Sequence, residues 1–334
     1  MRIGPYEIEA GVILAPMAGV TDLPFRALCK SLGAEMVVGE MTASDPSLRD
    51  TRKSRLRRIH QDEPLPRAIQ ILGWDPGMMA EAAAWNVEQG ASIIDINMGC
   101  PAKKVCKKAA GSALMADEDQ VEKILKAVVA AVNVPVTLKT RTGISPDKKN
   151  GVRIAQIAEQ AGIAMVSVHG RTRSCMYKGQ AEYDTIKKVK QSVSIPVIAN
   201  GDITSVETAR RVLDYTQADG VMIGRGAHGQ PWLPGLIAKS LTHNVTLRSP
   251  DLPMQLNIVI THLRSIHEYY GEYQGVRIAR KHIKWYLSRF ENSREFISLI
   301  NQSESGESQI DQVSQFYNLM CNSNITQSIH SVAA

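Results

Sequence analysis

Short apolar runs typical of buried parallel strands alternate with helix-like segments over roughly the first two thirds of this 334-residue chain. We predict strands at residues 12–17, 34–39, 68–72, 93–97, 134–139, 164–169, 196–199 and 220–223. Helices are predicted between them at residues 22–32, 75–89, 117–132, 152–161, 184–191 and 205–215, several beginning at an Asp or Ser that can cap a helix. This alternation favours an α/β fold, a closed (β/α)8 TIM barrel, over an open doubly wound sheet.

The chain is longer than a barrel requires, since about 250 residues suffice for that fold. We therefore predict a catalytic barrel over residues 1–245 and a C-terminal all-helical domain over residues 250–320. Apolar residues at helical spacing place two helices of that domain at residues 258–270 and 275–290. Residues 321–334 are rich in Ser and Asn, and we expect them to form a flexible tail.

Composition places the chain among ordinary globular proteins. Hydrophobic residues make up 44% and charged residues 22%, which argues against a disordered or fibrous protein. No apolar run is long enough to cross a membrane, and no apolar signal-peptide core follows Met1, so we expect a soluble, cytoplasmic protein. The five cysteines lack the paired spacing of zinc or redox sites, so we expect free thiols and no metal site.

Polar and charged residues occur where most of the predicted strands end. In α/β barrels these carboxyl ends form the rim that holds ligands, so the side chains are expected to converge there. They are Glu40, Gln70, Asn97, Cys100, Lys139, Arg141, His169, Arg171, Asn200, Asp202 and Arg225. Gly201 and Gly224 follow the seventh and eighth predicted strands, where barrels commonly hold a phosphate with backbone amides.

Cys100 lies just past the fourth predicted strand, between Gly99 and Pro101. A thiol with an ordinary pKa near 8.5 is mostly protonated at neutral pH, so it can act as an acid, or as a nucleophile once activated. The alternative is a packing role, because free cysteine is among the most buried residue types. For Cys106, six positions on, a structural role and a resolving thiol both stay open.

Residues 224–229 formally match the GxGxxG fingerprint of dinucleotide-binding folds. That fingerprint opens a βαβ unit, whereas no further strand is predicted after residue 223. The GxxxxGK[ST] loop of nucleotide hydrolases does not occur in the chain. Neither a Rossmann fold nor nucleotide hydrolysis is therefore predicted.

Basic residues gather in three short runs, at residues 49–58, 103–108 and 277–289, although the net charge is only +6. A single run of this kind usually marks a solvated face. Three runs, one of them adjoining Cys100, indicate a polyanionic partner whose phosphates they neutralise.

Five motifs together resemble those of the tRNA-dihydrouridine synthases. They are APMAGVTD at residues 15–22, NMGCP at 97–101, KTRTG at 139–143, HGRTR at 169–173 and ANGDI at 199–203. The segments CPAKKV at 100–105 and RIARKH at 277–282 are similar to the bacterial B type in particular. The resemblance covers residues 1–290.

The resemblance implies an FMN enzyme that reduces the 5,6 double bond of specific uridines in tRNA, with NADPH or NADH as the reductant. The implied cofactor-binding residues of the barrel are Pro16, Met17, Ala18, Gln70, Lys139, His169, Asn200, Gly201, Asp202, Gly224 and Arg225. The implied substrate-binding residues are Asn97 and Arg141 at the uridine, and Arg277, Arg280, Lys281 and Lys284 in a helical domain that grips tRNA. No obligate protein partner is indicated.

In the implied reaction a hydride passes from reduced flavin to C6 of the uracil, so a proton must reach C5. Cys100 is the expected proton donor, because a thiol of ordinary pKa is already protonated. Lys139 and Arg141 would stabilise the negative charge that develops on the ring. The uridine must leave its stack to reach the rim.

Two other functions stay open at this point. One is an FMN-dependent oxidoreductase of a free pyrimidine, which would not need the basic helix at residues 277–289. The other is a catalytically idle tRNA-binding barrel, which would not need the rim residues. The modified uridine positions, the choice between NADPH and NADH, and the oligomeric state are not indicated by the sequence.

Overall fold

The computed structural model describes residues 1–58, 60, 63–291 and 293–332. The chain divides into two compact units. The first comprises residues 1–227 and 232–247, and the second comprises residues 228–231 and 248–334. No helix among the described residues has both the length and the apolarity needed to cross a lipid bilayer.

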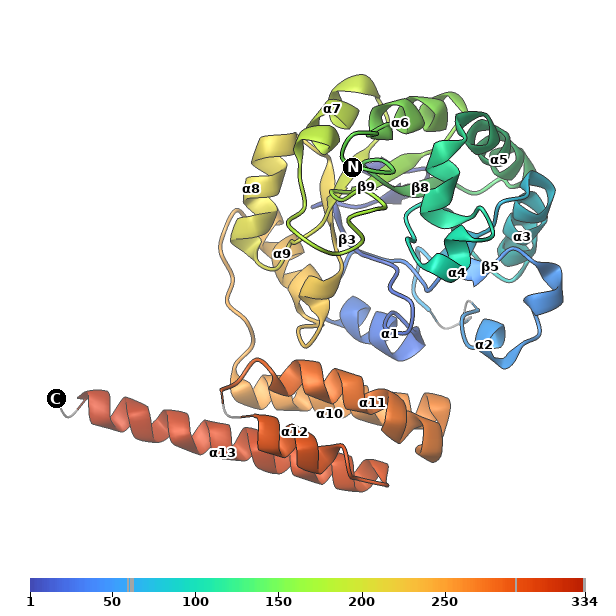
Figure 1. The fold of residues 1–334 in the computed structure, drawn as a ribbon. Coiled ribbons are helices and arrows are strands. Elements are labelled where there is room, and N and C mark those ends of the chain that lie inside the picture. The colour runs from blue at the N-terminus through green and yellow to red at the C-terminus, as the bar shows by residue number, and fades with distance from the viewer. Residues whose placement is uncertain (59, 61–62, 292, 333–334) are drawn as a thin grey trace. The chain divides into compact units, whose positions relative to one another are not determined.

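The first unit is built on a parallel sheet of nine strands (Figure 1). In order around the sheet they are β4 (Met36–Val37), β3 (Val12–Leu14), β11 (Gly220–Ile223), β10 (Val197–Asn200), β9 (Met165–His169), β8 (Val136–Arg141), β7 (Ile93–Asn97), β6 (Ala68–Leu72) and β5 (Thr42–Ala43). A parallel bridge between Val38 and Ala68 joins the end of β4 to β6, so the sheet closes on itself. The predicted TIM barrel is confirmed.

Helices surround the barrel, and they begin where the sequence offers a cap. The main ones are α1 (Leu23–Ser31), α3 (Pro76–Glu88), α5 (Glu118–Ala131), α6 (Gly151–Gln160), α7 (Asp184–Ser192), α8 (Val206–Thr216) and α9 (Leu233–Thr242). The side chains of Asp22, Asp75, Asp117 and Ser205 each accept a hydrogen bond from a backbone N–H in the first turn of a helix. These caps satisfy amides that the helix itself leaves unpaired.

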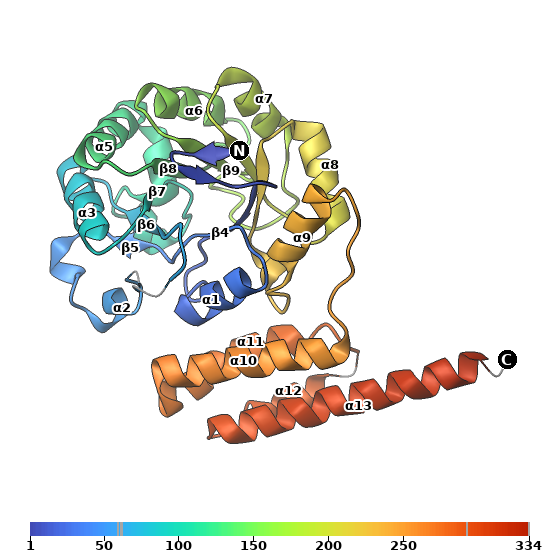
Figure 2. The same ribbon diagram turned by 180° about the vertical axis from the view of Figure 1, so that it is seen from behind.

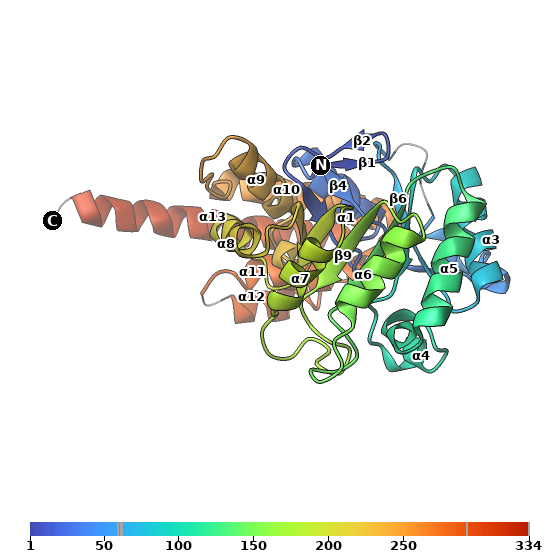
Figure 3. The ribbon, with the colours of Figure 1, turned by 90° about the horizontal axis from the view of Figure 1, so that it is seen from above.

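An N-terminal hairpin of β1 (Arg2–Ile3) and β2 (Tyr6–Glu7) packs at one end of the barrel (Figure 2). Its Ile3 and the following Ile8 join the apolar cluster that the inward side chains of the strands form. The short helix α4 (Lys103–Cys106) and the loop after β9 lie at the opposite end (Figure 3). The hairpin therefore closes the amino-terminal end of the barrel and leaves the carboxyl end for ligands.

The second unit consists of α10 (Leu252–Tyr270), α11 (Glu272–Leu287), α12 (Arg294–Ile300) and α13 (Gly306–Val332). The apolar faces of α10 and α11 pack together. Phe290, just after α11, makes an edge-to-face contact with Phe316 of α13, with ring centroids 5.4 Å apart. The described residues from 252 onward are mostly helical and contain no strand, as the sequence predicts.

The second predicted strand differs most from the structure. Residues 34–39 were expected to form one strand, but the strand breaks after Val37 and resumes as β5. The break contains Glu40, whose carboxylate pairs with Arg57 at 2.7 Å and accepts a hydrogen bond from the Gly19 amide. These tertiary contacts turn the chain out of the sheet.

The predicted helices are present, with ends displaced by a few residues. Helices α2 (Arg52–Arg55), α4, α9, α12 and α13 were not predicted. Arg289, expected in the basic helix, lies beyond the end of α11 at Leu287. Helix α13 includes residues 321–332, so much of the segment that we predicted as a tail is helical, and its flexibility stays a prediction.

Replacing Ile3 by Ala should destabilise the barrel, because Ile3 is fully buried in the cluster that closes its amino-terminal end. We expect the free energy of unfolding to fall by about 2–5 kcal/mol, as for other buried Ile-to-Ala changes. Urea unfolding followed by circular dichroism would measure this change. Exposed Glu7 in the same hairpin provides the control, and equal stability of the Ile3→Ala and Glu7→Ala proteins would contradict a closing role for the hairpin.

Candidate active site at the carboxyl end of the barrel

The loop that carries Cys100 is held by hydrogen bonds on both sides. The backbone amides of Gly99 and Cys100 donate to Asn97 Oδ1 at 3.2 and 3.0 Å. The Cys100 carbonyl accepts from the amide and the hydroxyl of Ser112 at 3.0 and 2.9 Å, and Arg141 Nε donates to the Gly99 carbonyl at 2.6 Å. The half-buried thiol is therefore presented from a fixed backbone.

A chain of buried side chains stands behind Asn97. Asn97 Nδ2 donates to Gln70 Oε1 at 2.7 Å, and Gln70 Nε2 donates to Asp95 Oδ2 at 2.7 Å. Thr137 donates to the other oxygen of Asp95 at 2.6 Å. Burial raises the pKa of Asp95 to about 6, although the hydrogen bonds from Thr137 and Gln70 and the charge of Lys139 lower it. The network fixes the orientation of both amides.

The thiol of Cys100 is kept in its protonated form. Burial raises its pKa and is the largest effect, while a hydrogen bond with the Ala102 backbone and the charge of Arg141 act in the opposite direction. Cys106 adds a smaller effect that also raises the pKa of Cys100. A thiol with a raised pKa is a proton donor at neutral pH and a weak nucleophile.

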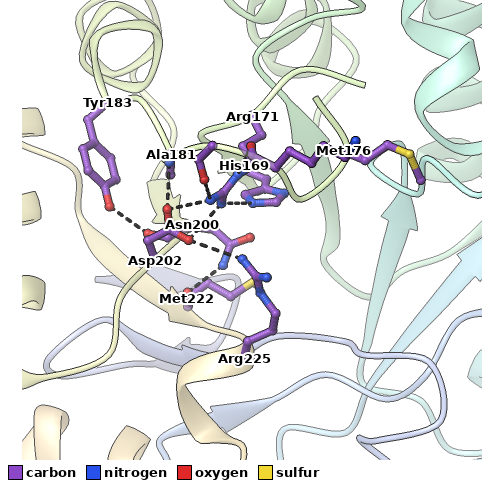
Figure 4. Close-up of polar contacts among 12 residues, drawn as sticks. His169, Arg171, Met176, Ala181, Tyr183, Asn200, Asp202, Met222 and Arg225 are labelled. Carbon is purple, nitrogen blue, oxygen red and sulfur yellow. Dashed lines mark hydrogen bonds and ion pairs between the residues drawn. The ribbon is translucent and has the colours of Figure 1, made fainter. Parts of the chain in front are cut away.

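Lys139 lies at the end of β8, beside Arg141 on the same strand. Its Nζ donates to Asn200 Oδ1 at 3.0 Å. Asn200 Nδ2 donates in turn to the Met222 carbonyl at 2.7 Å (Figure 4). Burial and the neighbouring Arg141 lower the pKa of Lys139 to about 8, although the charge of Asp95 acts in the opposite direction. No carboxylate of the described residues forms an ion pair with this ammonium.

Arg171, Asp202 and Arg225 form a second charged group, after β9, β10 and β11 (Figure 4). Buried Arg171 donates to both oxygens of Asp202, at 2.9 and 2.7 Å, and the Ala181 amide donates to Asp202 at 2.8 Å. Arg225, which is largely exposed, is 3.4 Å from the same carboxylate. Burial would raise the pKa of Asp202, but these hydrogen bonds and charges outweigh it and lower the pKa.

His169 lies between the two groups of cations and is neutral. Burial is the main reason that its pKa is lowered to about 2, and the charges of Lys139, Arg141, Arg171 and Arg225 lower it further. These four charges are all positive. At physiological pH the ring offers one N–H donor and one acceptor nitrogen.

The loop after β9 covers Arg141. Arg141 is only 1% exposed, and its Nη1 donates to the carbonyls of Thr172 and Met176 at 3.0 and 2.8 Å. The Tyr177 ring lies 5.4 Å from the guanidinium carbons of both Arg141 and Arg225. Arg141 therefore ties the Cys100 loop to the loop after β9.

The structure brings most of the predicted rim residues together in the first unit. Gln70, Asn97, Cys100 and Arg141 share one network, and Lys139, His169, Asn200, Asp202 and Arg225 adjoin it. Pro16, Met17 and Ala18 follow β3, and a Cβ placed on Gly224 would lie 4.0 Å from the Met17 sulfur and 3.9 Å from the Ala15 Cβ. The ends of β3 and β11 therefore meet, as the predicted pocket requires.

The four predicted tRNA-binding residues lie on α11 in the second unit, but their surroundings differ. Arg277 and Lys284 are exposed. The Arg277 guanidinium stacks 3.5 Å from the centroid of the exposed Tyr273 ring. Arg280 is half-buried and donates to the Ser303 carbonyl at 3.3 Å, so it also holds its own unit together. Lys281 is half-buried as well.

Sequence reasoning missed three residues of the network. Asp95 carried a signal, because an acid inside an apolar strand is unusual and requires partners. Thr137 and Ser112 carried none, since hydroxyl residues are common on strands and in loops.

The fold and the rim define an α/β-barrel protein with an excess of enclosed positive charge at the carboxyl ends of its strands. A family model described as "Dihydrouridine synthase (Dus)" matches residues 13–321. The chain belongs to the dihydrouridine synthase family.

Relatives along the full length are of the B type. The chain is 56% identical over 334 residues to a Pseudomonas syringae protein named tRNA-dihydrouridine synthase B, covering 100% of this chain and 99% of the relative. It is 55% identical over 319 residues to the protein of that name from Vibrio cholerae, covering 95% and 98%. The family that the five motifs predicted is confirmed.

Among solved structures, a variant of NCR from Zymomonas mobilis matches with a TM-score of 0.51 at 16% identity, over 76% of this chain and 93% of that one. Morphinone reductase in complex with tetrahydroNAD matches with a TM-score of 0.50 at 13% identity, over 76% and 92%. At these identities the matches support the barrel fold alone.

The pH dependence of Cys100 alkylation should report its raised pKa. Because burial disfavours the thiolate, we expect the iodoacetamide reaction at Cys100 to require a higher pH than that of a small peptide thiol. Mass spectrometry of the Cys100 peptide after timed alkylation would give the midpoint. A midpoint at or below that of the peptide thiol would mean that the thiol is activated as a nucleophile.

Proposed function

We propose that this protein is a tRNA-dihydrouridine synthase, which uses FMN and NADPH or NADH to reduce the 5,6 double bond of specific uridines in tRNA. The relatives that match its whole length carry that name with the suffix B. The observation that carries the proposal is a protonated thiol, Cys100, held at the barrel rim beside enclosed cations. A reductase of a carbon–carbon double bond needs a proton donor of this kind.

The rim residues fit the phosphate of FMN. Arg225 is largely exposed. The single carboxylate of Asp202 pairs with both Arg171 and Arg225, so part of the positive charge of these two arginines is not neutralised. At Gly224 a Cβ would meet nothing nearer than 3.9 Å, so there is room for a ligand to approach the backbone. Gly201 has a φ of +129°, and a Cβ there would lie 2.7 Å from the Ala181 Cβ, so this turn requires glycine. Amides after β10 and β11, together with Arg225, would hold the phosphate.

The residues nearer the barrel axis fit a flavin ring. Lys139 is a half-buried cation that forms no ion pair with a described residue and is only partly compensated by the charge of Asp95, which suits an anionic ring. Gln70 and neutral His169 offer hydrogen-bonding groups, and residues 16–18 supply an apolar lining. Asn200 would act through Lys139, whose ammonium it orients.

When bound, FMN reduced by NADPH or NADH supplies a hydride to C6 of the uracil. Cys100 would give its proton to C5 and return to the thiol form by taking a proton from solvent. Arg141 would stabilise the negative charge that develops on the uracil ring, since its Nη2 is not used by the loop carbonyls in the described residues. Asn97 would keep the thiol in place, because both of its loop contacts are to backbone amides.

The uridine would have to leave its stack to reach Cys100, at a cost of a few kcal/mol. Basic residues of the second unit would offset part of this free-energy cost by binding phosphates. Exposed Arg277 and Lys284 suit this role, whereas Arg280 also holds the helices of its own unit together.

A reductase of a free pyrimidine would need none of these basic residues, so equal rates on free uracil and on tRNA would favour that alternative. An idle tRNA-binding barrel would stay colourless after addition of FMN.

The Cys100→Ala protein should lose dihydrouridine formation but keep its flavin. The donor of the proton to C5 is absent, while no phosphate-binding group is changed. We expect product formation to fall at least about 100-fold, the lower end for loss of a general acid. Mass spectrometry of tRNA nucleosides would measure product, and visible absorbance would measure flavin content and its bleaching by NADPH. Loss of flavin from the variant would show that Cys100 is structural.

Changing Arg277 and Lys284 together to Ala should weaken tRNA binding and reduce its salt dependence. Two exposed cations are removed, and the slope of log K against log salt falls by about 0.7–0.9 for each phosphate that is no longer neutralised. Filter binding at several salt concentrations would measure the slope, with flavin content as the control for an intact barrel. An unchanged affinity would remove α11 from the RNA interface.

A further inference from the structure

Trp74 stands apart from the other tryptophans of the chain because its side chain is exposed. It is 49% exposed, whereas Trp232 is only 3% exposed. Trp85 lies between two arginine guanidinium groups, and Trp285 stacks on a histidine ring with centroids 3.9 Å apart. A large flat ring left half in water offers a face on which a planar ligand can stack.

The backbone around Trp74 is fixed. A Cβ on Gly73 would lie 2.1 Å from Ser44 Oγ, so the chain packs against the segment after β5 just before the tryptophan. The Trp74 carbonyl accepts a hydrogen bond from Gln120 at 2.7 Å. Asp75, the next residue, caps α3. The ring is therefore mounted on a rigid support rather than on a mobile loop.

This support lies at the same end of the barrel as Cys100. Trp74 follows β6 by two residues, and β6 carries Gln70, which belongs to the network behind Cys100. Ser44, against which Gly73 packs, is followed by Asp45. The pKa of Asp45 is lowered, mainly by hydrogen bonds from Ser47 and to a smaller extent by the charge of Lys108. Trp74 and the segment after Cys100 therefore both follow strands at the carboxyl end of the barrel.

That segment is strongly basic. Its exposed lysines are Lys103, Lys104, Lys107 and Lys108, and residues 101–116 contain no acidic residue. None of the four forms an ion pair with a residue that the structure describes. Exposed cations and an exposed aromatic ring at the same end of the barrel suit a nucleic acid, which offers phosphates to the cations and a base to the ring.

We propose that Trp74 is a stacking platform for an RNA base next to the uridine that enters the barrel, and that Lys107 and Lys108 contact the flanking phosphates. The inference rests on the proposed function, because extrusion of one nucleotide leaves the faces of its neighbours unstacked. An indole can replace the extruded base as a stacking partner whatever the sequence of the RNA, since every base has a π-face.

Stacking and charge contacts should be separable by their salt dependence. We expect Trp74→Ala to weaken binding of unmodified tRNA transcripts about 5- to 100-fold with little change in salt slope, in the range of single base–aromatic stacks. Trp74→Phe should keep most of the affinity. The Lys107→Ala, Lys108→Ala double variant should lower the slope by about 1.4–1.8. Fluorescence anisotropy of labelled transcripts, measured from about 50 to about 300 mM salt, would test all three.

Tyr215→Ala provides the matched control, because Tyr215 is another exposed aromatic residue, 46% exposed and on the outer helix α8. It should bind tRNA as the unmodified protein does. Wild-type affinity of Trp74→Ala would overturn the inference, as would equal losses for Trp74→Phe and Trp74→Ala accompanied by a lower melting temperature. Because binding is measured without turnover, the two failures are distinguishable: absence of dihydrouridine in every tRNA would contradict the proposed function, whereas wild-type binding by Trp74→Ala would contradict only the stacking role.

Discussion

The site depends on positive charge that is enclosed at the carboxyl ends of the strands without equal negative charge. Arg141 and Arg171 are buried and Lys139 is half-buried. Arg171 has the carboxylate of Asp202, but the hydrogen bonds of Arg141 go to backbone carbonyls and that of Lys139 to an amide oxygen. Removing a cation from water costs free energy unless an anion lies beside it. The barrel thus holds in place an arrangement that an anionic ligand would stabilise.

The enclosed positive charge and burial together set the protonation states of His169 and Cys100. His169 is neutral because burial and four cations disfavour a further positive charge. Cys100 stays a thiol for a different reason, since nearby Arg141 favours the thiolate and burial outweighs it. A small shift in the exposure of the Cys100 loop would therefore change the acidity of the thiol. Asn97, Ser112 and Arg141, which fix that loop, protect the chemistry as well as the geometry.

Local patterns predicted the barrel and the position of Cys100, because each parallel strand is buried on both faces and reads as a short apolar run. The ends of β6, β7 and β11 coincide with the predicted ends for this reason. The break at Glu40 was not predictable, since its cause is the pairing with Arg57 and the Gly19 amide, 17 and 21 residues away. The network around Asp95 likewise joins residues 25 and 42 positions apart.

The basic runs at residues 49–58 and 103–108 show why a cluster of basic residues in the sequence does not by itself identify a nucleic-acid-binding surface. In the run at residues 49–58, Arg49, Arg57 and Arg58 each pair with an acid of the barrel unit, and two of them flank Trp85. They hold the segment between β5 and β6 against α3. The lysines after Cys100 have no acidic neighbours in sequence and no ion pairs among the described residues, so their charge faces solvent. Exposed Arg52, Lys53 and Arg55 of the first run form no ion pair with a described residue either, so the charge that a run offers to a polyanion is decided residue by residue.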